Sequence, residues 1–241
     1  MSSNRFEGQT FVVTGAGSGI GYATTCQLCE EGAQVLALDV TFANGMPAGA
    51  ECVSVDVCSE ERLAEAARRV PDGIDGLAAF AGIEMGGRID TLNIVGWQRV
   101  FDVNVLGTVR TIAAFLPALR QKGGSIVLCS SQLSIAGARD CPAYAASKGA
   151  INTLCRSLAL DHAAEGIRVN AIAPGATDTP MMTRSFRGKP GTAVEAAKQR
   201  HAMGRFGTAR ESANAALFLM SGDATFTTGV VFPVDGGWCI A

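Results

Sequence analysis

The fold is decided by the stretch Thr10-Phe11-Val12-Val13-Thr14-Gly15-Ala16-Gly17-Ser18-Gly19-Ile20-Gly21. Its first five residues are apolar or β-branched and predict a buried strand, and a helical pattern follows over residues 20–31. Closely spaced glycines between a strand and a helix let the backbone approach a pyrophosphate, and the helix N-terminus offers N–H donors to it. Glycines also make ordinary tight turns, but the strand before them and the helix after them favour dinucleotide binding here.

One acidic residue, Asp39, is expected to select the cofactor. It ends the second predicted strand, eighteen residues after Gly21. A carboxylate at this place accepts both hydroxyls of an adenosine ribose and repels a 2′-phosphate. No Lys or Arg stands at positions 18, 40 or 41 to offset the repulsion, so we expect NAD rather than NADP. The alternative is a solvated acid at a strand end. Asp56-Val57, after the third strand, is expected to contact the adenine, with a turn-forming Asp as the alternative.

Short apolar runs alternate with helical stretches along the whole chain. This alternation predicts an α/β fold, a single doubly wound Rossmann-type domain over residues 1–241 with a mostly parallel seven-stranded sheet and helices on both faces. The predicted strands are 10–14, 34–38, 52–55, 76–80, 125–129, 168–173 and 230–234. The predicted helices are 20–31, 60–70, 97–121, 143–164 and 209–221. Residues 40–51 leave little room for a further helix.

Residues 177–206 break the alternation. They contain no good strand pattern, and Gly188-Lys189-Pro190-Gly191 interrupts any helix. An insertion of about 30 residues after a strand of a compact domain is typical of a functional lid. We therefore expect residues 177–206 to form a substrate-binding lid at the end of the sheet where open α/β folds bind ligands.

Composition excludes several classes of function. The 241 residues carry a net charge of -2 with Lys and Arg scattered along the chain, which argues against a nucleic-acid partner. No apolar run reaches the ~20 residues that span a membrane. The first eight residues are polar and lack a signal-peptide core, so we expect a cytoplasmic protein. Among eight cysteines, Cys26 and Cys29 form a CxxC, but they fall in a helical pattern without a second pair, which favours structural thiols over a metal site.

Tyr144 and Lys148 are the strongest candidates for chemistry. Four residues are about one helical turn, so the two side chains lie on one face of the predicted helix. A phenol has a pKa near ~10, and an ammonium beside it favours the phenolate. The pair is therefore expected to exchange a proton with an alcohol or a carbonyl near neutral pH. The spacing alone also occurs by chance in many helices.

Taken together, these motifs resemble the compact type of the short-chain dehydrogenase/reductase family. The resemblance runs from Gly8 to Trp238, and its order and spacing are specific. The residues that carry it are Thr14 to Gly21, Asp56, Asn104, Ser131, Tyr144, Lys148, Pro174-Gly175, Thr179 and Val234-Asp235-Gly236-Gly237. Many relatives have Asn-Asn-Ala-Gly after the fourth strand, whereas this chain has Ala79-Phe80-Ala81-Gly82, so the strand tie made by the first Asn is missing.

The resemblance implies a role for each of four polar residues. Tyr144 is the general acid/base, and Lys148 lowers the tyrosine pKa and binds the nicotinamide ribose. Ser131 hydrogen-bonds the substrate oxygen, with its neighbour Ser130 as the risk of misassignment. Asn104 holds a water that links Lys148 to solvent, although a tolerated polar residue in a helix is the alternative.

The resemblance also assigns the cofactor contacts. Thr179 binds the nicotinamide carboxamide with help from the backbone of Thr177, and capping of the following helix by Thr179 is a competing, compatible role. The full expected set for NAD is Gly15, Ser18, Gly19, Ile20, Gly21, Asp39, Asp56, Val57, Ala81, Gly82, Tyr144, Lys148, Pro174, Gly175, Thr177 and Thr179.

The positions that face the substrate in this family are polar and soft apolar here. They are Glu84, Ser131, Gln132, Cys141, Tyr144, Met181 and Arg205, with Ala176 and Met182 beside them. The mixture suggests a small or medium secondary alcohol or its ketone. Cations in the lid, including Arg205, suit a small hydroxy acid or a dihydrodiol acid, although surface solvation explains them as well.

Two further expectations concern the oligomeric state and the class of function. The resemblance and the long apolar faces over residues 103–119 and 150–160 predict a homo-oligomer, a tetramer or else a dimer. The alternative function is a non-catalytic dinucleotide-binding sensor or scaffold, but such relatives typically lose the tyrosine or the lysine, and this chain keeps both. A nucleotide-sugar epimerase or dehydratase needs a larger C-terminal domain than the ~35 residues that follow Phe206 provide.

Overall fold

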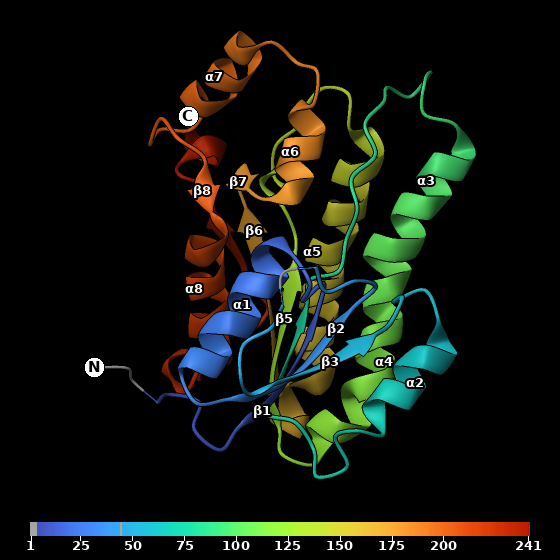
Figure 1. Ribbon diagram of the computed structural model, residues 1–241, viewed down its shortest axis with the longest axis vertical. Coiled ribbons are helices and arrows are strands. Elements are labelled where there is room, and N and C mark those ends of the chain that lie inside the picture. Colours follow the sequence, from blue (N-terminus) through green and yellow to red (C-terminus); the bar gives the residue numbers. More distant parts are fainter. Residues whose placement is uncertain (1–3, 44) are drawn as a thin grey trace.

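Seven parallel strands form the centre of the molecule in the order β3-β2-β1-β4-β5-β6-β9 (Figure 1). The computed structural model describes residues 4–43 and 45–241. The strands are β1 (Thr10–Thr14), β2 (Gln34–Asp39), β3 (Ala50–Ser54), β4 (Gly76–Ala79), β5 (Gly124–Cys129), β6 (Ile167–Pro174) and β9 (Val231–Val234). Every neighbouring pair is parallel. The predicted sheet is confirmed, and the predicted strand bounds agree within two residues.

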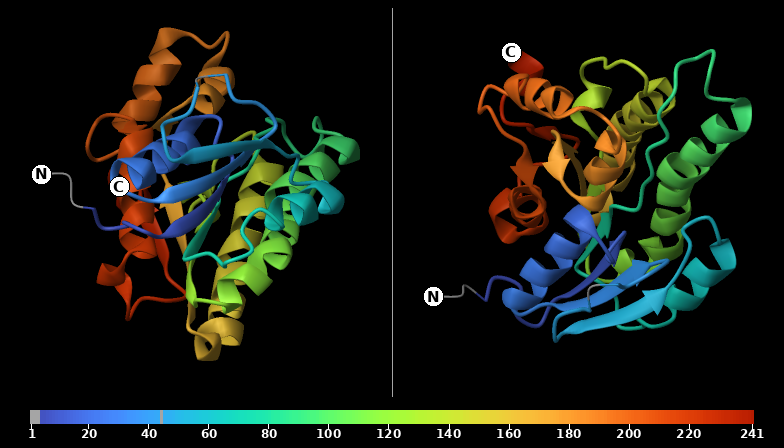
Figure 2. Two further views of the ribbon diagram at one scale, coloured as in Figure 1. Left: turned by 60° about the horizontal axis from the view of Figure 1, so that its bottom comes forward. Right: turned by 45° about the horizontal axis from the view of Figure 1, so that its top comes forward.

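Helices cover both faces of this sheet (Figure 2). They are α1 (Gly19–Glu30), α2 (Glu60–Ala67), α3 (Ile94–Phe101), α4 (Gly107–Arg120), α5 (Pro142–His162), α6 (Pro180–Phe186), α7 (Gly191–Gln199) and α8 (Ala209–Met220). Side chains alternate across a strand, so neighbouring residues of β1 enter different cores. Val12 packs in the core that includes Phe115 of α4, whereas Val13 packs with Leu28 of α1 and Leu217 of α8. Burial on both faces explains the continuous apolar runs in the sequence.

The order of the strands predicts where a ligand crevice lies. The chain leaves β1 for β2 on one side and later returns to β4 on the other side, so the sheet changes direction between β1 and β4. Open α/β sheets bind ligands at the carboxyl ends of the strands beside such a switch point. The turn after β1 and the segment after β4 both lie at this edge, and no helix separates β2 from β3 in the described residues between them.

The long helix predicted over residues 97–121 is interrupted. α3 begins three residues earlier, where the side chain of Asn93 accepts a hydrogen bond from the Gly96 N–H at 2.9 Å. A π-helical turn, η1 (Asp102–Leu106), then separates α3 from α4. Within the described part of the chain, Ile94–Arg120 is the one helix long and apolar enough to cross a membrane by length and composition. Phe115 and Leu119 are fully buried against the sheet, as in a core helix.

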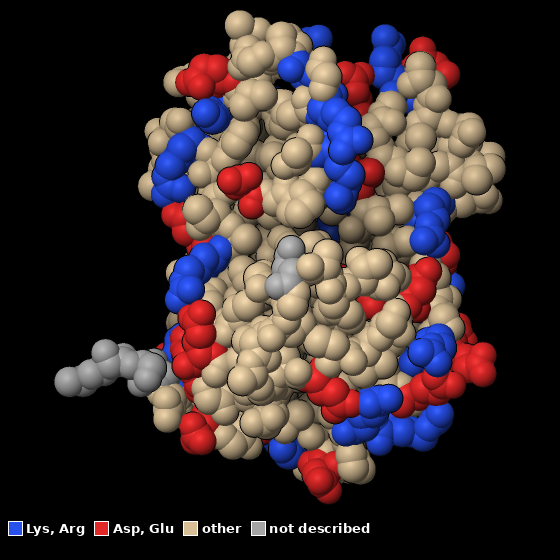
Figure 3. Space-filling view, in the orientation of Figure 1, with Lys and Arg blue, Asp and Glu red and all other residues tan. Residues whose placement is uncertain are grey.

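Residues 177–206, the predicted lid, lie beyond the carboxyl ends of the strands, at the top of Figure 1. It holds α6 and α7, and its two ends pair as a small parallel sheet, β7 (Thr177–Asp178) with β8 (Gly207–Thr208). The expectation that residues 177–206 contain no strand was therefore wrong. Two-residue strands that pair over 30 positions leave no periodic pattern in a sequence, which is why the prediction missed them. On the face drawn in Figure 3, positive and negative side chains are interspersed.

Candidate active site

The turn after β1 forms a cradle that only glycine permits. A Cβ on Gly17 would lie 2.0 Å from the carbonyl oxygen of Thr41, and one on Gly21 would lie 2.2 Å from the carbonyl oxygen of Gly15. Gly15 itself has a φ of 69° and faces the backbone of Ala81. α1 starts directly after this turn, and the first N–H groups of a helix have no acceptor within it. The cradle fits a pyrophosphate, because bare backbone and free N–H groups face the same space.

Asp39 is held against this turn. Its Oδ2 accepts a hydrogen bond from the Gly17 N–H at 2.9 Å, and its Oδ1 accepts one from the Thr41 N–H at 3.3 Å. The carboxylate therefore lies at the end of β2 beside the glycine cradle, as expected for a ribose-binding acid. Asp56 accepts a hydrogen bond from the Cys58 N–H at 2.9 Å, so its turn-forming role is real, and it also lines the cavity described next.

A single cavity of about 600 Å³ runs from the cradle to the lid. Every residue of the expected cofactor set lines it, and so do the candidate catalytic residues Ser131, Tyr144 and Lys148. Its size is within the range of small-molecule sites, ~300–1,000 Å³. A nicotinamide dinucleotide therefore fits the residues present.

Tyr144 and Lys148 face the cavity from α5. The Lys148 ammonium lies 5.6 Å from the centre of the Tyr144 ring and donates a hydrogen bond to the carbonyl oxygen of Cys129 at 2.7 Å. Burial raises the pKa of Tyr144 above its usual value, the charges of Cys129 and Glu84 raise it further, and a hydrogen bond with Ser131 lowers it. Burial also lowers the pKa of Lys148.

The expected lowering of the Tyr144 pKa by Lys148 stays a prediction. Lys148 is 97% buried, its ammonium donates to a carbonyl oxygen, and burial lowers its own pKa. Burial and the nearby negative charges oppose the phenolate form of Tyr144. Further positive charge beside the ring favours that form.

Asn104 positions the site through its side chain. It is 1% exposed in the π-helical turn; its Oδ1 accepts from the Ile83 N–H at 2.8 Å. Its amide nitrogen donates to the Ile83 carbonyl oxygen and to Ser147 Oγ, both at 3.0 Å. Both amide protons are thus used within the protein, so the expected water contact does not involve them. Asn104 also joins the segment after β4 to α5.

The two neighbouring serines have different surroundings. Ser130 is 1% exposed and its Oγ donates to Asn152 Oδ1 at 2.5 Å, inside the contact between β5 and α5. Ser131 has its Oγ beside the Tyr144 phenol, where it also accepts a hydrogen bond from the Leu133 N–H at 3.1 Å. The geometry supports Ser131 as the serine that meets the substrate.

Two of the expected substrate residues lie outside the cavity. Arg205 makes a two-pronged ion pair with Glu211, with N–O distances of 2.7 and 3.0 Å, and lines a smaller neighbouring cavity. Cys141 is buried at the start of α5. The cations that line the main cavity in the described residues are Arg99, Lys148, Arg184, Lys189 and Arg200. Glu84, Gln132 and Met181 do line it, as expected.

Residues at the edge of the site perform tasks that the sequence did not reveal. Thr14 Oγ1 accepts hydrogen bonds from the N–H groups of Phe80 and Ala81 at 3.1 and 3.3 Å, and so replaces the missing asparagine tie between strands. His201, 3% exposed, accepts the Ala176 N–H at Nε2 and bonds the Ala197 carbonyl at Nδ1, which fastens α7 to the loop after β6. The only signals in the sequence were a threonine at the end of a predicted strand and one of the two histidines of the chain.

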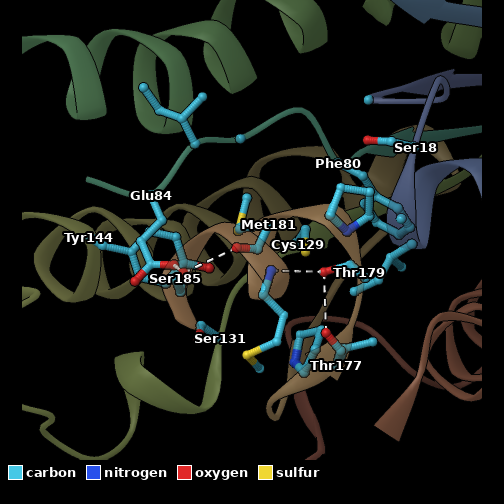
Figure 4. Close-up of a pocket in the computed structure, with 18 of the residues that line it drawn as sticks. Ser18, Phe80, Glu84, Cys129, Ser131, Tyr144, Thr177, Thr179, Met181 and Ser185 are labelled. Carbon is cyan, nitrogen blue, oxygen red and sulfur yellow. Dashed lines mark hydrogen bonds between the residues drawn. The ribbon is translucent and has the colours of Figure 1, made fainter. Parts of the chain in front are cut away.

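The structure also shows the surroundings of Thr179 and of the cysteine pair Cys26 and Cys29. Thr179 caps α6 by accepting the Met182 N–H at 3.4 Å, while it lines the cavity (Figure 4). Cys26 and Cys29 are free thiols of α1, and burial raises the pKa of Cys29 to about 11. Residues 4–43 and 45–241 contain no group of three or more His, Cys, Asp or Glu side chains that could hold a metal ion.

The chain is similar to known proteins along nearly its whole length. A family model described as enoyl-(acyl carrier protein) reductase matches residues 15–239. The 3-oxoacyl-(acyl-carrier-protein) reductase of Thermotoga maritima is 34% identical, and the alignment covers 98% of this chain and 100% of that protein. The dehydrogenase/reductase SDR family member 6 of Rattus norvegicus is also 34% identical, with 98% of this chain and 99% of that protein covered.

The fold has close counterparts among solved structures. The ligand-free aldohexose dehydrogenase of Thermoplasma acidophilum superposes with a TM-score of 0.92 at 30% identity, over 99% of this chain and 97% of that one. The cradle, the cavity and these similarities agree. The chain belongs to the short-chain dehydrogenase/reductase family, whose members are oxidoreductases that bind a nicotinamide dinucleotide on a Rossmann fold.

Proposed function

We propose that the protein is an NAD-dependent oxidoreductase that transfers a hydride between a secondary alcohol, or its ketone, and nicotinamide. The observation that carries this proposal is the continuous cavity wall that joins Asp39 to Ser131 and Tyr144. A dinucleotide held in the glycine cradle reaches along that wall to the phenol. A non-catalytic sensor would have no need of the buried proton donor, ammonium and serine at the far end.

The cofactor preference rests on the charge at the ribose end. Asp39 points at the cradle and is bonded there by backbone N–H groups alone. A 2′-phosphate would place two like charges side by side, whereas ribose hydroxyls donate to the carboxylate. The carboxylate therefore favours NAD over NADP.

The protein residues divide the proton chemistry between them. Bound NAD supplies the hydride acceptor and the positive charge that favours a phenolate. Ser131 Oγ orients the substrate oxygen, and the Tyr144 phenol oxygen accepts the hydroxyl proton as the carbinol C–H bond breaks. Lys148, anchored on the Cys129 carbonyl at 2.7 Å, is placed to hold the nicotinamide ribose. In the reverse direction the same phenol returns the proton to the carbonyl oxygen.

The substrate is proposed to be small or medium in size. Met181 and Phe186 give the lid side of the cavity an apolar surface, and Arg184 and Lys189 add cations there. These cations support a small hydroxy acid or a dihydrodiol acid, in which the carboxylate faces the lid. Arg205 takes no part, because Glu211 neutralises it.

We also propose that the protein is a cytoplasmic homotetramer. Leu106 at the end of the π-helical turn, Val109 in α4 and Leu160 near the end of α5 are 48, 41 and 82% exposed. Apolar side chains in such number on two neighbouring core helices favour contact with a second copy.

A substrate screen tests the activity. Purified protein is mixed with NAD or NADP and with secondary alcohols, hydroxy acids and cyclic diols, and NADH absorbance is followed. We expect NADH formation with a subset of these alcohols and a higher kcat/KM with NAD. Ser131→Ala is expected to lower turnover about 10²-fold or more, because the substrate oxygen loses its orienting hydrogen bond. An absence of cofactor binding by fluorescence titration would reject the proposal.

A further inference from the structure

Glu84 places a carboxylate beside the reacting centre without a cationic partner. It lines the cavity, and its Oε2 accepts a hydrogen bond from Ser185 Oγ of α6. Its negative charge helps to raise the pKa of Tyr144, and both side chains line the same cavity. Figure 4 labels Glu84, Ser185 and Tyr144 among the residues of this cavity. Within residues 4–43 and 45–241, no Lys or Arg lies within salt-bridge distance of this carboxylate.

The proposed chemistry does not use this carboxylate. Tyr144 and Ser131 account for the substrate oxygen, and Lys148 and the glycine cradle serve the cofactor. Glu84 is an acceptor, so the group it suits is a donor on the substrate. Hydroxyl groups donate, whereas a carboxylate beside Glu84 would place two like charges together.

We propose that Glu84 recognises a second hydroxyl group, so that the favoured substrate is a vicinal diol. This inference rests on the proposed alcohol oxidation at Tyr144. It also narrows the hypothesis that the substrate is a hydroxy acid or a dihydrodiol acid. A carboxylate on the carbon next to the carbinol is excluded by Glu84, and an acid is accepted only where its carboxylate reaches the lid cations Arg184 and Lys189.

Three compounds on one ring test the proposal. They are 1,2-cyclohexanediol in its cis and trans forms, cyclohexanol, and 2-hydroxycyclohexane carboxylate. With NAD we expect kcat/KM for the better diol to exceed that for cyclohexanol about 10-fold or more, because a charge-assisted hydrogen bond is gained. The hydroxy acid is expected below cyclohexanol. Equal values for diol and cyclohexanol would overturn the proposal.

Matched variants separate recognition from lid packing. In Glu84→Gln, kcat/KM is expected to fall for the diol and to rise for the hydroxy acid, changing their ratio about 10-fold or more. Ser185→Ala removes the lid hydrogen bond but keeps the carboxylate, so the ratio should stay within about 2-fold. An equal loss of preference in Ser185→Ala and Glu84→Gln would mean that Glu84 only holds the lid, and would overturn the proposal.

A binding measurement distinguishes this inference from the proposed function. Dissociation constants of the diol and of cyclohexanol are measured by fluorescence on the protein loaded with NADH, where no turnover is needed. Tighter binding of the diol that is lost in Glu84→Gln supports the inference even if neither ring is oxidised. Equal dissociation constants reject it while the proposed function stands. A protein that fails to bind NADH rejects the proposed function itself.

Discussion

The amide nitrogen of Asn104 donates a hydrogen bond to Ser147 Oγ across 3.0 Å, and this contact joins the π-helical turn to the helix that carries Tyr144. Ser147 Oγ in turn donates to the carbonyl oxygen of Tyr144 at 2.7 Å. π-Helical turns occur often at functional sites because they redirect a side chain within a helix. Here the turn directs Asn104 toward both the catalytic helix and the segment after β4.

Replacing Asn104 by leucine tests this link. Leu cannot pair with the N–H and carbonyl groups of Ile83, so we expect a loss of about 2–3 kcal/mol in the free energy of unfolding, measured in urea. Turnover should fall as well, because α5 loses its anchor. Asn93→Ala is the control, since it removes a helix cap at a cost of about 1 kcal/mol away from the cavity. A fully active and stable Asn104→Leu protein would show that the contact is incidental.

The carboxylate of Asp39 should decide between the two cofactors. We expect Asp39→Ser to lower the ratio of kcat/KM for NAD to that for NADP by about 10- to 100-fold, because repulsion of the 2′-phosphate disappears. Asp56→Ser is the matched control; it removes an acid from the neighbouring strand end and should weaken both cofactors alike. A wild-type protein that prefers NADP would refute the role of Asp39.

The chain contains only two tyrosines, which makes the ionisation of Tyr144 measurable. Burial raises the pKa of Tyr144, and a hydrogen bond with Cys26 raises that of Tyr22. Both phenols should therefore stay neutral to pH values above their ordinary pKa of ~10. We expect phenolate absorbance to appear at lower pH only after NAD is added, and to vanish in Tyr144→Phe but not in Tyr22→Phe. A phenolate near neutral pH without NAD would mean that Lys148 suffices.

The exposed apolar side chains of α4 and α5 predict an assembly. Light scattering at micromolar concentration should give a homotetramer, and Val109→Glu or Leu160→Glu should reduce its mass by placing a charge in a buried contact. Ile89→Glu is the control, because that side chain is 74% exposed on the connection between β4 and α3. A monomeric wild-type protein would exclude the assembly.

Local sequence patterns were sufficient for the sheet and for much of the candidate site. The glycine spacing from Gly15 to Gly21 and the four-residue step from Tyr144 to Lys148 are short-range signals. The structure places Gly15, Gly19, Gly21, Tyr144 and Lys148 on one cavity. The period of the apolar runs likewise predicted the parallel sheet, because burial on both faces leaves continuous apolar strands.

What the sequence could not reveal depends on which side chains contact each other and on how deeply they are buried. Arg205 looks like a lid cation until Glu211 is seen to neutralise it. The pKa of Tyr144 depends on how deeply the ring is buried, which no spacing records. Thr14 takes the place of the missing asparagine by accepting a hydrogen bond from Phe80, 66 positions away. A single threonine in a strand pattern does not predict that contact.

The central claim is that Tyr144 is the acid/base of an NAD-dependent alcohol oxidoreductase. Tyr144→Phe removes one oxygen atom, and Tyr22→Phe makes the same change outside the site. For an alcohol oxidised by the wild-type protein, turnover and NADH binding are measured together on both variants. We expect Tyr144→Phe to lose about 10²- to 10⁴-fold or more in turnover while its NADH dissociation constant changes by less than about 3-fold, and Tyr22→Phe to match the wild type. Undiminished turnover in Tyr144→Phe would contradict the assignment.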